Sequence, residues 1–482
     1  MVSVAFSWVP SVWYDESATI VSATRTWKEL WTEIHHVDAV HATYYALMHA
    51  WFAAVGYTPF SLRFPSAVAI GVAAAVVTML ASQLTDKRTG FVAGLLFVLL
   101  PRVTWAGGEG RSYAIETALA AGLSLVFVYA SRRTRSDARY FRWWALYGIL
   151  AVASTFMFLY AALVVVAHGV TLALWALRSR RAGRTTPWRP ALGGWIVAAG
   201  IAGLLAVPLA KLSTAESKQI GWIGKPDLSV FGEFFTTQWF TGNPAFTVFG
   251  WALVAVGIVV TLRKGARYNS PNVLQMTIPW MLLPPLSLIA ISLVSNPLYS
   301  PRYVTFCAPT VAILMATGLT SIRLRSLIAA GLVVSLGLTL PSYVAQRQPE
   351  AKDNSSWKEV AALITKERRI EGINATDAII YGHIRRHPTG SARNIAYAYP
   401  SAFTGMTDVT LKTSAAQSGQ LWETRYPLSK TIERVDGHHY VWLVTSNKQD
   451  LRPSVTKALA GEGYHVTDEW HLKWVNIVRY QR

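Results

Sequence analysis

Three short clusters combine acidic, basic and aromatic side chains that could move a proton and bind phosphate. They lie at residues 13–16, 107–113 and 299–303. Their candidate functional residues are Asp15, Glu16, Glu109, Arg111, Tyr113, Tyr299, Arg302 and Tyr303. A carboxylate can take a proton from a hydroxyl group, and a guanidinium group can stabilise negative charge on phosphate oxygens. The clusters therefore predict acid–base chemistry on a phosphate-bearing molecule.

Each cluster also has a purely structural interpretation. Asp15 could cap a helix, and Glu16 would suit the positive end of that helix dipole. Glu109 and Arg111 could simply cap and neutralise a tight loop. Arg302 could reach lipid headgroups from the end of a membrane span. Whether the three clusters share one side of a membrane helps to decide between these interpretations.

The composition is that of a membrane protein. The 482 residues are 52% hydrophobic and 15% charged, whereas soluble domains average about 45–50% apolar and about 25% charged residues. Twelve per cent aromatic residues and a single cysteine, Cys307, exclude a disordered chain and a disulfide scaffold. An ordinary soluble enzyme is excluded as well.

The net charge of +19 comes from basic residues that sit in short clusters between long apolar runs. The clusters are Lys87 and Arg88; Arg132, Arg133, Arg135, Arg139 and Arg142; Arg178, Arg180, Arg181, Arg184 and Arg189; Arg263, Lys264 and Arg267; and Arg323 and Arg325. Such spacing is typical of cytoplasmic loops that follow the positive-inside rule. It argues against nucleic-acid binding, for which the cations would line one surface.

Runs of about 20 apolar residues predict membrane-spanning helices. We expect spans near 64–84, 91–107, 113–130, 191–210, 243–262, 273–294, 303–321 and 326–345, with two short spans in 143–177 that turn near 154–160. A short first span before residue 14, or upstream residues that are missing, would bring the total to about eleven. With every basic cluster inside, residues 107–113, 211–242, 295–302 and all those after about 346 lie outside. All three chemical clusters then share the outer face.

Two further regions are too polar to span. Residues 14–62 mix charged residues with Trp and Tyr, which predicts helices lying in the outer interface; they carry His41 and Tyr45. From about residue 346 the sequence predicts an α/β domain, with a helix ending near Arg368. Its expected strands are 377–381 and 440–445, followed by a terminal strand or hairpin in 464–480. We therefore expect a transmembrane domain at 1–345 and an extracytoplasmic domain at 346–482.

Paired carboxylates and separate guanidinium groups on one outer face suit the transfer of a sugar from a lipid phosphate to a hydroxyl group. The carboxylate would take the proton of the acceptor, and an arginine would stabilise the departing phosphate. No nucleotide site is needed on that side.

Five motifs, in this order, resemble the signature of GT-C membrane glycosyltransferases, in particular the bacterial protein-mannosyltransferase and aminoarabinose-transferase-like branch. They are Tyr14-Asp15-Glu16, His41-Ala42-Thr43-Tyr44-Tyr45, Arg63-Phe64-Pro65-Ser66, Glu109-Gly110-Arg111-Ser112-Tyr113 and Arg302-Tyr303. The resemblance covers roughly residues 1–345, and many family members append an outer α/β domain. Ala42 and Thr43 stand where the family has two prolines.

The resemblance implies an inverting transfer, mannose being the first expectation, from a polyprenyl-phosphate sugar to a hydroxyl acceptor in the cell envelope. Asp15 would be the catalytic base, assisted by Glu16. Glu109 would lie near the sugar and Arg302 would bind the donor phosphate. The remaining substrate-binding candidates are His41, Tyr45, Arg111, Tyr113, Tyr299 and Tyr303. Lys211, Lys218 and Lys225 could also meet phosphate, although a solvated loop explains them equally well.

Several alternatives stay open. The transferred sugar could be a pentose of the arabinose type. The chain could be a transporter or lipid flippase, for which Pro208, Pro279, Pro284 and Pro285 would mark broken helices. It could also be a structural membrane protein. No metal is assigned because the sequence has no dense set of carboxylates, although related transferases use a divalent cation. The expected location is the inner or plasma membrane.

Overall fold

A computed structural model describes residues 2–133, 136–183, 188–216, 221–263, 270–322, 324–370, 377–385 and 387–482. The chain divides into two compact units. Unit 1 comprises Met1–Ala5, Asp38–Tyr44 and Arg63–Val344, and unit 2 comprises Phe6–Val37, Tyr45–Leu62 and Ala345–Arg482. Arg135, Arg184, Lys218, Lys264, Arg267 and Arg323 lie outside the described residues.

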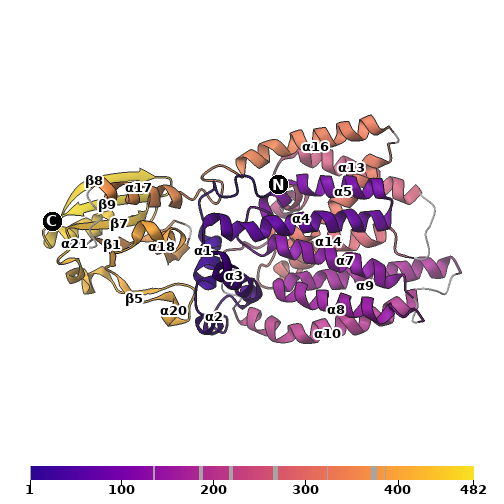
Figure 1. Ribbon diagram of the computed structural model, residues 1–482, viewed down its shortest axis with the longest axis horizontal. Coiled ribbons are helices and arrows are strands. Elements are labelled where there is room, and N and C mark those ends of the chain that lie inside the picture. Colours follow the sequence, from indigo (N-terminus) through magenta and orange to yellow (C-terminus); the bar gives the residue numbers. More distant parts are fainter. Residues whose placement is uncertain are drawn as a thin grey trace. The chain divides into compact units, whose positions relative to one another are not determined.

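Unit 1 is a bundle of apolar helices. Within the described residues, eight helical segments are long and apolar enough to cross a membrane. They are α4 (Pro59–Leu84), α7 (Tyr113–Ser131), Leu159–Arg181 with α9 (Ala162–Arg181), α10 (Trp188–Ala215), α13 (Pro244–Arg263), α14 (Val273–Val294), Pro301–Thr320 with η5 (Pro301–Cys307) and α15 (Ala308–Thr320), and α16 (Arg325–Ala345). Figure 1 shows these helices side by side. The chain is an integral membrane protein.

Two shorter helices complete the bundle. The run expected to turn near 154–160 does so, because α8 (Tyr140–Met157) ends at Phe158 before α9 begins. The span expected at 91–107 is wrong as one continuous helix. Leu100 is extended, with ψ 126°, and separates α5 (Lys87–Leu99) from α6 (Pro101–Ala106). Proline at position 101 disfavours a helical conformation in the residue before it.

The described members of the basic clusters in unit 1 lie at one end of its helices, and its predicted site residues lie at the other. At the basic end, the Arg132 guanidinium donates to Gln83 Oε1 at 2.6 Å, and the Tyr140 hydroxyl donates to the Pro190 carbonyl. Thr89 and Thr320 meet at the same end at 2.9 Å. Because consecutive spans run in opposite directions, the loops that carry Arg111 and Arg302 lie at the opposite end.

The expected short span before residue 14 is wrong for the described residues, since residues 2–13 form turns and extended chain. Two backbone donors of this segment pair with residues far along the chain. Ser11 N–H donates to the Pro349 carbonyl at 2.8 Å, and Val12 N–H donates to the Tyr399 hydroxyl at 3.0 Å. Those partners satisfy donors that a helix would otherwise satisfy internally.

Unit 2 contains the helices expected at 14–62 and a small α/β domain. The former are α1 (Tyr14–Ala23), α2 (Trp27–Glu33) and α3 (Ala42–Val55), of which α3 crosses the boundary between units. The expected domain helix is α17 (Trp357–Ile370). The expected strands are β1 (Ala378–Tyr381) and β7 (Tyr440–Ser446), and the terminal hairpin is β8 (His465–Leu472) and β9 (Val475–Gln481). All four predictions are confirmed.

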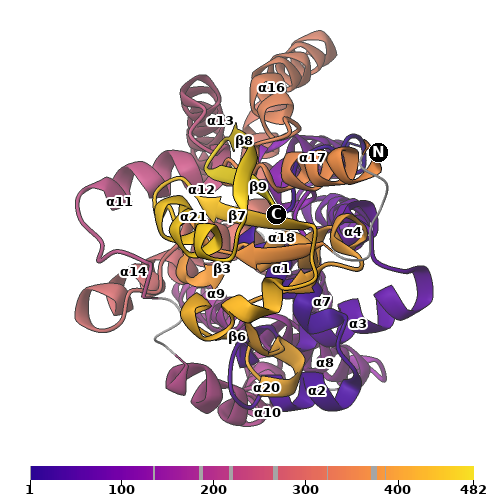
Figure 2. The ribbon, with the colours of Figure 1, turned by 90° about the vertical axis from the view of Figure 1, so that its left-hand side faces the viewer.

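The sheet of unit 2 has the order β4-β1-β7-β9-β8, in which β4 is Thr407–Asp408. β1 pairs in parallel with β4 and β7, whereas β9 is antiparallel to β7 and β8. Helix α21 (Arg452–Gly461) packs Val455 and Leu459 against one face. On the other face, Arg368 of α17 and Trp442 of β7 both donate to Asp377. Figure 2 labels α17, α21 and the strands β7, β8 and β9 of this domain.

Candidate active site

The loop between α6 and α7 holds two of the predicted residues in a buried position. Gly107 packs against the N-terminal segment of unit 1, where an added Cβ would lie 2.4 Å from Ser3 Oγ. Glu109 is 1% exposed and Arg111 is 6% exposed. The Ser66 hydroxyl on α4 donates to the Arg111 carbonyl at 3.3 Å. This loop is therefore a packed element rather than a solvated connection.

His41 and Arg111 form a close pair at the centre of this region. The Arg111 Nη2 atom lies 2.6 Å from His41 Nε2, and a guanidinium group can only donate. His41 must therefore accept at Nε2 and carry its proton on Nδ1. Burial lowers the pKa of His41 below its usual value, and the positive charges of Arg111 and Arg302 lower it further. His41 is thus neutral and holds Arg111 in place.

Arg302 is the more accessible guanidinium of this region. It lies at the start of η5, directly after Pro301, and is partly exposed. Its guanidinium carbon lies 4.6 Å above the Trp222 ring and 5.5 Å from the Tyr303 ring. Stacking on these rings orients the planar guanidinium group.

A cluster of aromatic rings lies beside His41 and Arg302. Tyr303 lies 5.6 Å from Phe158, 6.0 Å from Tyr160 and 6.4 Å from Tyr113, measured between ring centroids. Phe158 in turn stacks on the imidazole of His41 at 6.0 Å. Low-dielectric surroundings of this kind strengthen the interaction between the guanidinium groups and an anion.

Sequence reasoning missed Arg102, which lies in the segment expected to span. Arg102 is 6% exposed, and it donates to the carbonyls of Thr237 and Gln238. Thr237 ends a π-helical turn, Glu233–Thr237, that turns these carbonyls toward the guanidinium group. Gln238 also accepts a hydrogen bond from the Tyr299 hydroxyl at 2.8 Å. The proline at 101 was the one sequence signal that Arg102 does not belong to a regular span.

The predicted site residues divide between the two units. His41, Glu109, Arg111, Tyr113, Tyr299, Arg302 and Tyr303 belong to unit 1. Arg102 links several of them, because it lies within electrostatic range of Glu109, Tyr113, Tyr299 and Arg302. Asp15, Glu16 and Tyr45 belong to unit 2. Tyr45 is completely buried in α3.

Asp15 and Glu16 have different surroundings although they are neighbours in α1. Asp15 is partly exposed and occupies the second position of the helix, whose N-cap is Trp13. The interpretation of Asp15 as an N-cap is therefore wrong. Glu16 is completely buried and pairs with Lys352 Nζ at 3.1 Å. Sequence reasoning missed Lys352 because it lies in what looked like the link between two domains.

The structure gives little support to the other candidate phosphate-binding and metal-binding residues. Lys211 and Lys225 are exposed, and Lys218 lies outside the described residues. Among the residues that the structure describes, no three His, Cys, Asp or Glu side chains gather as a metal ion would require.

Known structures resemble this chain over almost its whole length, although the sequence matches no protein-family model and no curated protein. ArnT from Cupriavidus metallidurans in the apo state superposes with a TM-score of 0.62 at 12% identity, over 99% of this chain and 95% of that one. The chain therefore has the fold of ArnT. The same protein bound to undecaprenyl phosphate gives a TM-score of 0.57 at 11% identity, over 99% and 96% of the two chains.

A third likeness is to the arabinofuranosyltransferase AftD from Mycobacteria. Its TM-score is 0.50 at 15% identity, and it covers 100% of this chain but 41% of that chain. These likenesses confirm the expected fold class, a GT-C-like helical membrane protein with a C-terminal α/β domain.

Proposed function

We propose that this chain is an inverting glycosyltransferase. It would move a sugar from a polyprenyl-phosphate donor to a hydroxyl group of a cell-envelope glycan, glycolipid or protein, at the outer face of the cell membrane. The observation that carries the proposal is the grouping of buried His41 and Arg111 with the partly exposed Arg302, at the end of the bundle opposite the basic loops. The ArnT structure with undecaprenyl phosphate supports it, because that protein shares the fold and binds a lipid phosphate.

In the proposed reaction the acceptor oxygen attacks the anomeric carbon of the donor sugar. The acceptor proton passes to the carboxylate that we assign as base, Asp15. The bond between the anomeric carbon and the phosphate oxygen breaks, and its electron pair stays on the polyprenyl phosphate. Arg302 would stabilise that charge through two parallel hydrogen bonds. Glu109 is assigned to the sugar.

The buried pair of Arg111 and His41 has a supporting role in this proposal. A neutral His41 adds no positive charge of its own, and it fixes the direction of the Arg111 guanidinium through the 2.6 Å contact. Arg111 would then already hold the rotamer that faces the donor. Less side-chain conformational entropy would therefore be lost when the donor binds. Glu16, held by Lys352, would fix the helix that carries Asp15.

For the sugar we propose mannose, and a pentose of the arabinose type is the second candidate. The likeness to an arabinofuranosyltransferase favours the second candidate. The assay that tests the function reconstitutes the protein in proteoliposomes and compares polyprenyl-phosphate mannose with polyprenyl-phosphate arabinose, each radiolabelled in the sugar. Donor-dependent labelling of a supplied envelope extract supports the proposal.

Two variants make the assay specific. Asp15→Asn removes basicity and keeps the shape, so transfer should fall at least about 100-fold. Arg302→Lys keeps the positive charge but loses the bidentate hydrogen bonds to phosphate, so the rate of transfer should also fall strongly. Arg139→Lys, at an exposed site in the opposite loop, is the control and should transfer normally. Wild-type rates in both test variants would reject the proposed roles, and no transfer from either donor would reject the function.

A further inference from the structure

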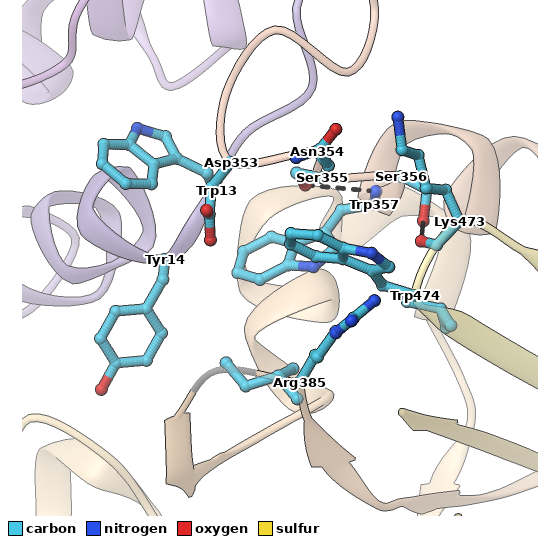
Figure 3. A pocket seen from close by; sticks show the side chains of 12 residues that line it. Trp13, Tyr14, Asp353, Asn354, Ser355, Ser356, Trp357, Arg385, Lys473 and Trp474 are labelled. Carbon is cyan, nitrogen blue, oxygen red and sulfur yellow. Dashed lines mark hydrogen bonds between the residues drawn. The ribbon is translucent and has the colours of Figure 1, made fainter. Parts of the chain in front are cut away.

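A pocket within unit 2 has the chemistry of a saccharide-binding site. Its lining comes from the start of α1, the chain before α17, the β2–β3 hairpin (His383–Ile384 and His387–Ser391) and the turn between β8 and β9. The lining residues are Trp13, Tyr14, Asp353, Asn354, Ser355, Ser356, Trp357, Ile384, Arg385, Lys473, Trp474 and Val475. In Figure 3, Trp13 and Tyr14 lie on one side of the hollow, and Trp357 and Trp474 lie on the other.

Four aromatic rings and a few polar groups characterise the pocket. Aromatic walls with a small number of polar groups are typical of small-molecule sites. The cavity volume is about 40 Å³, which is too small to enclose a whole sugar ring. A ligand would therefore lie against the partly exposed rings of Trp13, Tyr14 and Trp474 rather than enter a closed chamber.

The polar groups are placed to contact such a ligand. The Arg385 guanidinium carbon lies 4.4 Å over the Trp474 ring, and Figure 3 shows the side chain pointing toward that ring. Cation–π stacking holds the flat guanidinium group against the indole ring. The N–H donors then lie at the edge of the guanidinium group. Asn354 adds an amide that can both donate and accept. Neither side chain forms a hydrogen bond to a described residue, as judged over the part of the chain that the structure describes.

Positive backbone φ angles are concentrated at the same place. Among the described residues, six non-glycine residues have positive φ, and three of them line this pocket: Asp353 at 50°, Asn354 at 52° and Trp474 at 69°. Trp474 is the second residue of a two-residue turn between paired Leu472 and Val475. That conformation favours Gly or Asn, and a bulky residue there costs free energy. Such strain persists at ligand clamps more often than elsewhere.

The pocket is also anchored firmly to its surroundings. The Ser356 hydroxyl donates to the Lys473 carbonyl at 2.6 Å, which joins the start of α17 to the strained turn. Gly390 leaves room for Tyr14, because an added Cβ would lie 3.0 Å from its ring. The aromatic faces are thus held in position before any ligand arrives, which reduces the entropy cost of binding.

We propose that this pocket binds a saccharide ring, with Trp474 as the stacking platform and Arg385 and Asn354 as hydroxyl partners. The identification of that saccharide as part of the acceptor glycan rests on the proposed function. The binding itself does not, because it is measured without a donor.

The test uses the full-length protein in nanodiscs and ligand-observed NMR with four soluble probes: mannohexaose, arabinohexaose, galactohexaose and chitohexaose. We expect at least one to bind with a Kd on the order of 1 mM, as suits an open site. Trp474→Gly and Arg385→Gln should each weaken that binding at least about tenfold. Arg482→Gln is the matched control, because its guanidinium group lies over Tyr464 at 5.7 Å, outside the pocket.

Stability measurements separate binding from packing. Trp474→Gly should keep or raise the melting temperature, because glycine adopts a φ of 69° without strain. If it instead unfolds the protein, Arg385→Gln still tests the site. Absence of binding by all four probes, or equal binding by wild type and Arg385→Gln, would overturn the proposal. Binding without any glycosyl transfer would leave the pocket in place and reject the proposed reaction.

Discussion

At the scale of single residues, the contact between His41 and Arg111 makes the folded structure depend on the protonation state of His41. Arg111 donates to His41 Nε2, and burial together with two nearby arginines lowers the pKa of His41. A protonated His41 would place two positive charges in direct contact. Folding therefore requires the neutral imidazole.

This requirement predicts a pH dependence. Below about pH 6.5 an unfolded histidine takes up a proton that folded His41 does not. Stability should therefore fall as the pH drops, by up to about 1.4 kcal/mol per pH unit for this residue. His41→Gln keeps an acceptor for Arg111 and cannot be protonated, so its melting temperature should fall less between pH 7 and 5. Parallel melting profiles for wild type and variant would contradict this.

Glu16 gives a second prediction at this scale. Its carboxylate and the Lys352 ammonium are both buried, 3.1 Å apart. Glu16→Gln would remove the buried carboxylate charge that faces the Lys352 ammonium group, which should cost roughly 3–5 kcal/mol of unfolding free energy. Removing Lys352 as well, by Lys352→Met, should restore most of it.

The control for Glu16 is an exposed pair. Arg133 and Asp137 lie 3.0 Å apart with about a third of each side chain exposed, and Asp137→Asn should cost less than about 1 kcal/mol. Chemical denaturation in detergent checks both variants. Equal losses in Glu16→Gln and Asp137→Asn would show that burial of the pair is unimportant.

In unit 1, the sequence predicted which candidate residues lie near one another better than it predicted their surroundings. Residue types and motif order pointed to Glu109, Arg111 and Arg302, which the structure gathers at one end of the bundle. Arg102, Trp222 and Lys352 could not be found in this way, because their partners are far away in sequence and belong to no motif. Asp15 was predicted as a candidate, but its helical position was not.

At the scale of elements, hydropathy predicted the long spans well and the helix breaks poorly. The turn between α8 and α9 followed from the basic clusters at both ends of the run. The break between α5 and α6 did not, because Leu100 and Pro101 sit within apolar sequence that a hydropathy window averages. The segment before residue 14 was misjudged for a different reason. Its backbone partners, near residues 349 and 399, are contributed by distant sequence.

A polar cluster inside the bundle was not predicted from the sequence. His168 on α9 lies 3.0 Å from the Tyr147 hydroxyl on α8 and 3.1 Å from the Ser124 hydroxyl on α7. All three side chains are fully buried. Both ring nitrogens are thus occupied by neighbouring helices, which is typical of interhelical hydrogen bonds in membranes. The histidine fastens three helices and needs no ligand to explain it.

Close packing of α13 against α15 predicts a sharp effect of added volume. A Cβ on Gly318 would lie 2.2 Å from the Leu253 carbonyl oxygen, and one on Gly257 would lie 2.2 Å from that of Leu314. Backbone atoms cannot move aside as a flexible side chain can. Gly318→Ala should therefore lower the unfolding free energy by roughly 1–3 kcal/mol.

The matched control is Gly203→Ala on α10, where nothing lies within 4 Å of the added carbon. That variant should be neutral or slightly stabilising, because alanine favours the helix more than glycine does. Melting temperatures in nanodiscs compare the two. Equal melting temperatures would mean that α13 and α15 do not pack as closely as these distances require.

At the scale of the whole molecule, the distribution of charge predicts which loops face the cytoplasm. The described part of unit 1 places Arg132, Arg139 and Arg178 at one end of its helices and the predicted site at the other. Apolar spans and basic loops can be read directly from sequence. The division into two compact units could not, because unit 2 takes residues 6–37 and 45–62 from the first part of the chain.

The positive-inside rule gives the last prediction, that the basic loops are cytoplasmic and that residues 221–240 and the C-terminal domain are outside. Single cysteines at Ser136, Ser229 and Ser454, all exposed positions, test it. Native Cys307 is fully buried and should not react with the thiol reagent. In intact cells a membrane-impermeant thiol reagent should label Ser229→Cys and Ser454→Cys and spare Ser136→Cys until the membrane is permeabilised.

Labelling of Ser136→Cys in intact cells, with protection of the other two cysteines, would reverse the orientation. The proposed donor phosphate site at Arg302 would then face the cytoplasm, where nucleotide sugars are available. A polyprenyl-phosphate donor is needed only on a face without them, so this one experiment bears on the direction of the chain and on the chemistry of its substrate together.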